Sequence, residues 1–269
     1  MDKQDLIKAA EYFVENSEEN YITREIAISE NVVELKIYEA PIFAFGAADD
    51  ECFALLKQQS VIGEHFLLPK EWLPQAKTVI SFFLPFTEAV KKGNKRDMAW
   101  PSEEWLHGRI EGQVFINKLC AHLNSELLKA GYKSLVPALD ERFWCNTESS
   151  YTSNWSERHV AFVCGLGTFS LSKGLITQKG MAGRIGSLIT ELYLTPDRRE
   201  YEDLNEYCSM CGKCVKNCPV GAISLENGKD HSICSKFIDK TAVMYKPRYG
   251  CGKCQVSVPC ESKIPKKTK

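Results

Sequence analysis

Eight of the twelve cysteines lie close together near the carboxyl-terminal end of the sequence. Four of them form the motif C-x2-C-x2-C-x3-C-P, which runs from Cys208 to Pro219. This spacing is typical of cysteines that hold iron–sulfur clusters. The other four follow with a different spacing, C-x16-C-x2-C-x5-C, which begins at Cys234 and ends at Cys260. Eight thiolates supply the ligands that two [4Fe-4S] clusters need.

The first motif also predicts how the ligands are shared, because in two-cluster ferredoxins the cysteine before proline serves the other cluster. We assign one cluster to Cys208, Cys211, Cys214 and Cys260. We assign the other cluster to Cys218, Cys234, Cys251 and Cys254. Zinc is the competing metal, because two C-x2-C pairs can form a four-thiolate site. A zinc site would leave four neighbouring cysteines without a role.

Composition places the chain among soluble globular proteins. It has 269 residues, of which 44% are hydrophobic and 26% charged. The longest apolar run, residues 79–86, is too short to span a bilayer, and the amino terminus has no signal-peptide core. We therefore expect a cytoplasmic protein that does not enter the membrane. The net charge of −1 gives no overall basic field for nucleic acid, although residues 201–269 are net basic.

The order of the predicted elements favours an α+β fold over a Rossmann sheet. Apolar periodicity and capping residues predict helices over residues 5–16, 102–130 and 156–164. Short apolar runs predict strands over residues 77–86, 133–139, 175–177 and 185–194. A long polar loop is expected over residues 140–155. We predict an α+β domain over residues 1–200 and a ferredoxin-like two-cluster module over residues 201–269.

Residues 153–187 are unusually rich in glycine. Six glycines fall within 22 residues, at positions 165, 167, 174, 180, 183 and 186. Glycine allows the backbone to approach a ligand closely or to take positive φ, so we interpret the segment as a cofactor cradle. A series of tight turns is the alternative. The segment has neither a dinucleotide fingerprint nor a phosphate loop.

The order of short motifs resembles the superfamily of epoxyqueuosine reductases and reductive dehalogenases. Those motifs are Glu157-Arg158, Gly165-Leu166-Gly167, Gly174-Leu175-Ile176, Gly186-Ser187 and the cysteines that follow. The resemblance covers about residues 130–260. It implies a nitroreductase-like α/β-sandwich domain that binds a corrinoid, such as cobalamin, in the base-off form. The clusters would reduce the corrinoid cobalt, which in turn reduces the substrate.

The resemblance also implies the site residues. The cofactor-binding residues would be Asn154, Arg158, His159, Gly165, Leu166, Gly167, Thr168, Phe169, Gly174, Ile176, Gly186 and Ser187. The family places a catalytic aspartate shortly before Glu-Arg, where this chain has Tyr151. The nearest aspartate before that point is Asp140. We therefore take Asp140 and Tyr151 as candidate proton donors.

The electron path and the partners complete the prediction. Lys213 and Lys216 lie among the ligands of the Cys208 cluster, where they would attract a small acidic donor such as flavodoxin or ferredoxin. We expect the Cys218 cluster to face the first domain. The chain ends nine residues after Cys260, without the helical repeats that hold tRNA in the family, so we expect a small-molecule substrate rather than tRNA. The alternatives are an electron-transfer protein without corrinoid and an epoxyqueuosine reductase acting on tRNA.

Overall fold

The computed structural model describes residues 1–147 and 149–266, and its centre is an antiparallel sheet with the strand order β1-β2-β8-β3. The strands are β1 (Ile42–Ala47), β2 (Thr78–Pro85), β8 (Gly183–Thr190) and β3 (Ser134–Leu135). The strand predicted over residues 77–86 is confirmed, and every residue of β2 is buried. The strand predicted over residues 133–139 shrinks to β3, because Pro137 lacks the N–H that would extend the ladder and begins a 3-10 turn (Pro137–Leu139).

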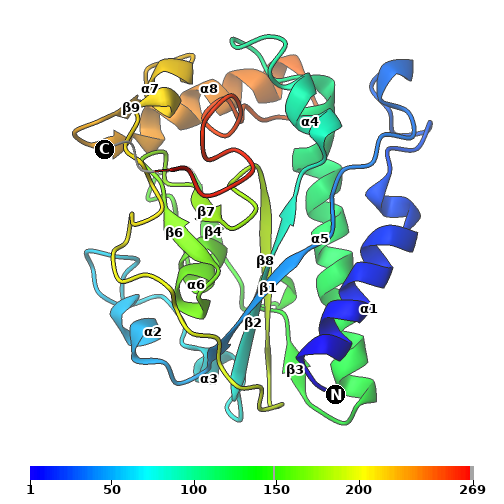
Figure 1. Cartoon of the computed structure of the whole chain (residues 1–269), viewed down its shortest axis with the longest axis vertical. Helices are drawn as coiled ribbons and strands as arrows, with labels where there is room; N and C mark the ends of the chain where they lie inside the picture. Colours follow the sequence, from blue (N-terminus) through cyan, green and yellow to red (C-terminus); the bar gives the residue numbers. More distant parts are fainter. Residues whose placement is uncertain (148, 267–269) are drawn as a thin grey trace.

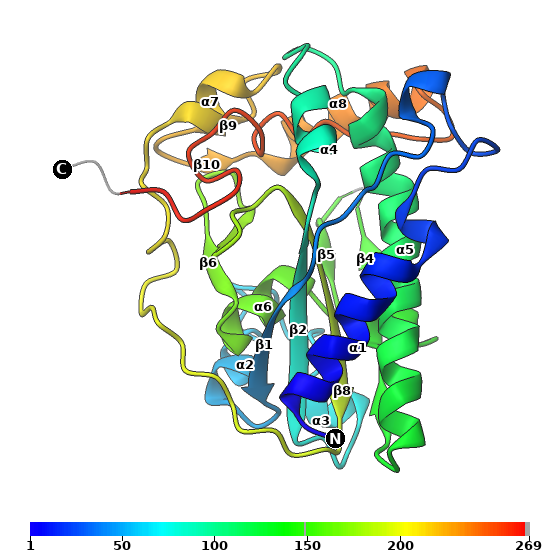
Figure 2. The same cartoon turned by 45° about the vertical axis from the view of Figure 1, so that its right-hand side comes forward.

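One face of the sheet is covered by two helices, α1 (Lys3–Asn16) and α5 (Glu103–Lys129). Figures 1 and 2 show both helices along the same side of the sheet. Ile80, Phe82 and Leu84 of β2 point into this layer, as the two-residue period of a strand requires. The hydroxyl of Ser102 accepts a hydrogen bond from Trp105 N and begins α5, as predicted.

The other face packs against three shorter helices, α2 (Glu51–Leu55), α3 (Pro69–Trp72) and α6 (Glu157–Cys164). Val79 and Phe83, which alternate with the residues of the first face, enter this second core. Helix α6 ends at Gly165, whose φ of 98° is left-handed, as the sequence predicts. The result is a sheet between two helical layers. The α+β class is thus confirmed.

Short elements connect these layers. A helix, α4 (Glu88–Gly93), follows β2, and two 3-10 turns (Glu18–Asn20 and Glu30–Val32) precede β1. Two hairpins pair β4 (Cys145–Asn146) with β5 (Thr152–Ser153) and β6 (Gly167–Phe169) with β7 (Leu175–Thr177). The polar loop predicted over residues 140–155 therefore contains a hairpin, and its residue 148 lies outside the described residues.

The cysteine-rich part of the chain caps one end of the sheet (Figures 1 and 2). Its elements are α7 (Lys213–Asn217), β9 (Ile223–Ser224), β10 (Gly228–Lys229) and α8 (His231–Met244). It is tied to the rest by an ion pair of 2.6 Å between Arg248 and Glu111 and by Lys253 Nζ, which donates to Asn94 O at 2.7 Å. These contacts cross the boundary predicted at residue 200. The division into two domains stays a prediction, and residues 267–269 lie outside the described part.

None of the helices in the described part of the chain has the length and apolar character of a membrane span.

Candidate functional site

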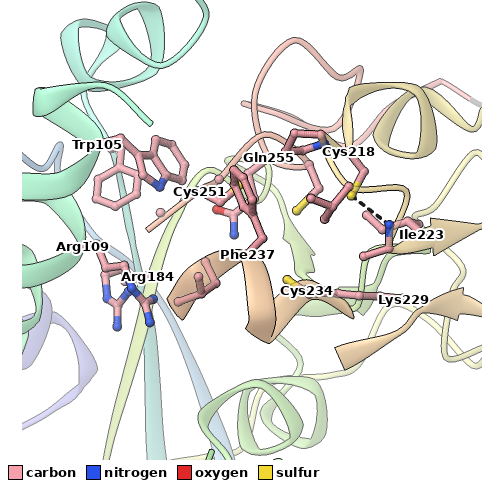
Figure 3. Close-up of a pocket in the computed structure, with 18 residues that line it drawn as sticks. Trp105, Arg109, Arg184, Cys218, Ile223, Lys229, Cys234, Phe237, Cys251 and Gln255 are labelled. Carbon is pink, nitrogen blue, oxygen red and sulfur yellow. Dashed lines mark hydrogen bonds between the residues drawn. The ribbon is translucent and has the colours of Figure 1, made fainter. Parts of the chain in front are cut away.

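The eight clustered cysteines fall into two groups in space. Cys208, Cys211, Cys214 and Cys260 surround one small cavity, which the Ser170–Ser172 turn also lines. Cys218, Cys234, Cys251 and Cys254 surround a second cavity, of about 230 Å³, shown in Figure 3. The two groups coincide with the two ligand sets predicted from the sequence, and their role as ligands stays a prediction.

The backbone around the cysteines offers hydrogen bonds to their sulfur atoms. In the described residues no three His, Cys, Asp or Glu side chains converge closely enough to hold one metal ion. The backbone N–H of Ala222 donates to Cys218 Sγ at 3.2 Å, the kind of hydrogen bond that tunes cluster potentials. Burial raises the pKa of the Cys251 and Cys260 thiols to about 12, so ligand binding there must displace protons.

A larger cavity of about 610 Å³, which we call the inner cavity, lies between α5, α6 and β8. The short β3 pairs with β8 at Ile189 and Thr190. The opposite end of β8, Gly183–Gly186, therefore leaves its edge open, and these four residues line the inner cavity. Cys254 lines the same cavity, so the second cysteine group reaches it directly.

A third cavity, of about 680 Å³, adjoins the inner one, and we call it the outer cavity. Its walls come from the β4–β5 hairpin, α6, α8 and the segment around His65. Arg109, Arg158 and Lys229 line both cavities, and Cys234 lines the outer one. The second cysteine group thus borders both spaces, as expected if its cluster faces the first domain. The first group also touches the glycine-rich segment, at Ser170–Ser172 and through Cys260 Sγ, which lies 3.3 Å from Met181 Sδ.

Four cations line the inner cavity: Arg109, Arg158, Arg184 and Lys229. In the described residues the ion-paired arginines are others, namely Arg24, Arg96, Arg142, Arg199 and Arg248. Figure 3 shows Arg109 and Arg184 side by side, next to Trp105. Two neighbouring guanidinium groups without a carboxylate partner create a field that attracts anions. The cavity therefore suits a ligand with an anionic group.

Several buried polar atoms at this site have no hydrogen-bond partner. They are Arg109 Nε, Arg184 Nε, Gln255 Oε1 and Glu157 Oε2 in the inner cavity and His231 Nε2 in the outer cavity. Leaving such an atom unpaired costs about 1–3 kcal/mol, so buried polar groups are ordinarily satisfied. Five such atoms around two adjoining cavities indicate a large polar ligand.

Some predicted cofactor-binding residues do line the cavities. Arg158, Gly174 and Gly186 line the inner cavity, and His159 lines the outer one. His159 Nδ1 lies 2.8 Å from Ser156 Oγ, and its ring lies 4.9 Å from that of Phe169. Burial, and then the charge of Arg158, lower the pKa of His159 to about 4, so its imidazole is neutral.

The other predicted cofactor-binding residues have structural roles, and their contact with a cofactor stays a prediction. Gly165 ends α6, and a Cβ at Gly167 would lie 2.1 Å from Ile176 O, so glycine there permits the close β6–β7 pairing. Asn154 accepts from Trp144 N and donates to Arg142 O. The side chains of Leu166, Thr168, Phe169, Ile176 and Ser187 are buried.

The two candidate proton donors, Asp140 and Tyr151, differ in their position relative to the two cavities. Asp140 pairs with Arg142 at 2.7 Å, and that hydrogen bond holds its pKa below the usual range. Asp140 is thus ionised at neutral pH and is not among the described residues that line the inner or outer cavity, so the structure does not support it as a donor. Tyr151 lines the outer cavity, with a left-handed φ of 51° and its ring edge-on to His231 at 5.5 Å.

The sequence interpretation missed the half-buried carboxyl group of Glu157, whose Oε2 atom is buried. Burial raises the pKa of its carboxyl group to about 8, against a smaller lowering by a hydrogen bond with Ser187. The acid therefore holds its proton at neutral pH. In the sequence Glu157 stands out only as part of the Glu-Arg motif, which carries no sign of burial.

Comparisons with known proteins match both parts of the chain. Residues 203–224 match the family model described as a 4Fe-4S binding domain. An epoxyqueuosine reductase of Bacillus cereus is 26% identical over 71% of this chain, and the match spans 50% of that protein. A tetrachloroethene reductive dehalogenase of Desulfitobacterium hafniense is 41% identical over 25% of this chain and 12% of its own length. The chain thus spans about half the length of the reductase and less of the dehalogenase.

Solved structures of the same two kinds share the fold. An epoxyqueuosine reductase, determined with an epoxyqueuosine-modified tRNA-Tyr stem loop, matches with a TM-score of 0.51 and 19% identity, over 96% of this chain and 65% of that one. A reductive dehalogenase, whose structure suggests a mechanism for B12-dependent dehalogenation, matches with a TM-score of 0.51 and 17% identity, over 73% of this chain and 27% of that one.

Proposed function

We propose that this chain, which belongs to the superfamily of epoxyqueuosine reductases and reductive dehalogenases, is an oxidoreductase that passes electrons from two [4Fe-4S] clusters to a corrinoid. One observation carries the proposal. The second cysteine group reaches both adjoining cavities, since Cys254 lines the inner and Cys234 the outer. A cluster held there would border a ligand without intervening protein.

The residues around the cavities fit a corrinoid. Such a molecule carries carboxamide groups and a phosphate. The unpartnered Nε–H groups of Arg109 and Arg184 can donate to the oxygens of both kinds of group, and Gln255 Oε1 can accept from a carboxamide N–H. When bound, the corrinoid supplies a cobalt centre that takes up electrons and reduces the substrate. A dehalogenase of similar fold, whose structure suggests a mechanism for B12-dependent dehalogenation, supports the same choice.

The chain's own side chains divide the remaining tasks. Arg109 and Arg184 bind the anionic part of the ligand, and Tyr151 is the proton donor that remains, because it lines the outer cavity. Cys211 is exposed in the first cysteine group, and Lys213 and Lys216 beside it are exposed as well. This face would receive electrons from a small acidic donor in the cytoplasm.

Epoxyqueuosine reduction on tRNA is the second candidate function. The expectation that tRNA is not the substrate finds no support in the comparisons, because a reductase solved with a tRNA stem loop shares the fold over 96% of this chain. A small molecule and tRNA therefore both remain candidate substrates. A gel-shift assay with the unmodified and the epoxyqueuosine-modified stem loop separates them, since only a tRNA reductase should retain the modified one.

Anaerobic titration of the cluster-loaded protein with cobalamin tests the proposal. We expect saturable binding and an optical spectrum of the base-off form. A double variant, Arg109→Met with Arg184→Met, should bind cobalamin more weakly, whereas Arg24→Met, at an exposed ion pair, serves as the control. An iron–sulfur protein that transfers electrons without a corrinoid would show no binding.

A further inference from the structure

Glu157 is the one carboxyl group that lines the inner cavity in the described residues, and nothing in the proposed function uses it. It is the first residue of α6, and its Oε2 atom is buried without a hydrogen-bond partner. Such an atom in a cavity wall is ordinarily satisfied when a ligand is present.

The surroundings of the Glu157 carboxyl group are rigid on the side of Ser187. Trp155 Nε1 donates to Ser187 Oγ at 2.9 Å. Trp155 is itself 2% exposed and stacks against Phe66 at a ring distance of 5.6 Å. The Ser187 side chain partly opposes the effect of burial on the pKa of Glu157. Glu157 Oε2 has no hydrogen-bond partner within the protein.

Burial decides the protonation state of this group. The amino-terminal end of a helix favours a carboxylate, but burial is the largest influence on Glu157 and favours the neutral acid. Charged groups reach the inner cavity from four elements: Arg109 of α5, Arg158 of α6, Arg184 of β8 and Lys229 of β10. The Cys254 thiol lines it as well. Cys120 of α5 also titrates there, and its own pKa is raised by burial. In the described residues none of the four cations forms an ion pair with Glu157.

We propose that Glu157 stands in the cavity wall as a neutral acid and donates its proton in a hydrogen bond from Oε2 to an acceptor atom of the bound ligand. The acceptor is an oxygen such as that of a carboxamide, a hydroxyl group or a phosphate. The ionised acid has no proton to donate and would repel such an oxygen. This inference rests on the proposed function, because it takes the inner cavity as the ligand site.

Two substitutions separate hydrogen bonding from charge. Glu157→Gln keeps the size and a donor at every pH, and Glu157→Ala removes the donor. Glu141→Gln changes an exposed carboxyl group outside the cavities and is the matched control. Cobalamin affinity is measured optically on cluster-loaded protein between about pH 6 and 9.5.

The wild-type protein and the Glu141→Gln variant should lose about tenfold in cobalamin affinity as pH rises above 8, where Glu157 ionises. Glu157→Gln should bind equally well across the range, and Glu157→Ala should bind about tenfold more weakly than wild type at pH 6. The inference would be overturned if the wild type bound cobalamin with an affinity that is independent of pH and equal to that of Glu157→Ala. If cobalamin fails to bind the wild type at all, the corrinoid proposal falls, and this role of Glu157 falls with it.

Thermal unfolding of the ligand-free protein tests the neutral state separately. The folded state keeps the proton of Glu157 up to a pKa of about 8, whereas the unfolded chain releases it near the ordinary glutamate pKa of 4.5. Stability from this group therefore falls as pH rises between these values. The melting temperature of Glu157→Gln minus that of wild type should rise from pH 5 to 8 and then level off. A difference that is constant over this range contradicts a neutral Glu157.

Discussion

Replacement of Gly252 by alanine should disrupt the second cysteine group and leave the first one intact. Gly252 follows Cys251 and has a left-handed φ of 69°. A Cβ at this position would lie 2.0 Å from Trp105 Cε2 and 2.1 Å from Cζ2. Carbon atoms ordinarily pack at about 3.5–4.0 Å, so one side must move by about 1.5 Å. Trp105 is 4% exposed and packs edge-on to Phe86 at 5.0 Å, which leaves it little room to yield.

The expected loss of stability has two parts. Left-handed backbone costs a residue with a Cβ about 1–2 kcal/mol, and overpacking at a rigid aromatic ring adds about 1–3 kcal/mol. Gly252→Ala should therefore destabilise the folded protein by about 2–5 kcal/mol. Gly221 is the matched control, because its φ is 62° and a Cβ there would meet nothing within 4 Å. Gly221→Ala should lose only the backbone part, about 1–2 kcal/mol.

Denaturant unfolding and iron analysis measure the effect. Displacement of residues 251–254 should empty the site of the second cysteine group and leave the first group loaded. We expect about four iron atoms per chain in Gly252→Ala and about eight in Gly221→Ala. Equal stability and full iron content in both variants would refute the view that Trp105 positions this cysteine group.

Two further predictions concern the clusters and the electron donor. Cys211→Ala should reduce iron from about eight to about four atoms per chain and leave the optical spectrum of the cluster at Cys218 intact, whereas stoichiometric zinc in the wild type would exclude the assignment. Charge reversal at Lys213 and Lys216, both exposed, should slow reduction by an acidic flavodoxin at low salt. The difference in rate should shrink as salt is added, and equal rates at low salt would exclude docking at this face.

The sequence predicts the parts of the fold that local rules decide. The continuous apolar run of residues 77–86 can be buried on both faces only in the middle of a sheet, and β2 lies there with both faces covered. Helix α5 begins at its capping serine, Ser102, and Gly131 follows it with a left-handed φ of 86°. The grouping of the cysteines follows from the ligand exchange of two-cluster ferredoxins, in which the cysteine before proline serves the other cluster.

The rest depends on contacts between distant segments, which spacing does not reveal. Glycines of one segment meet different neighbours: Gly167 meets β7, Gly180 meets the Glu261 backbone, and Gly186 meets both Phe82 and the inner cavity. Glycine density alone therefore does not say which glycines line the cavity. Glu157 lines the inner cavity opposite residues of α5 and β8, and such a contact between distant segments cannot be inferred from neighbouring residues. Asp140 pairs with Arg142, which is only two residues away, so this contact is local and is within reach of the sequence.

Anaerobic reductive titration of the protein loaded with both clusters and cobalamin tests the central claim most directly. Optical spectra follow the clusters and the corrinoid in the same sample while electrons are added. If the second cysteine group holds a cluster beside the inner cavity, bound cobalamin should be reduced together with the clusters, and Cys254→Ala should abolish its reduction without preventing its binding. Clusters that are fully reduced while bound cobalamin stays oxidised would contradict the account.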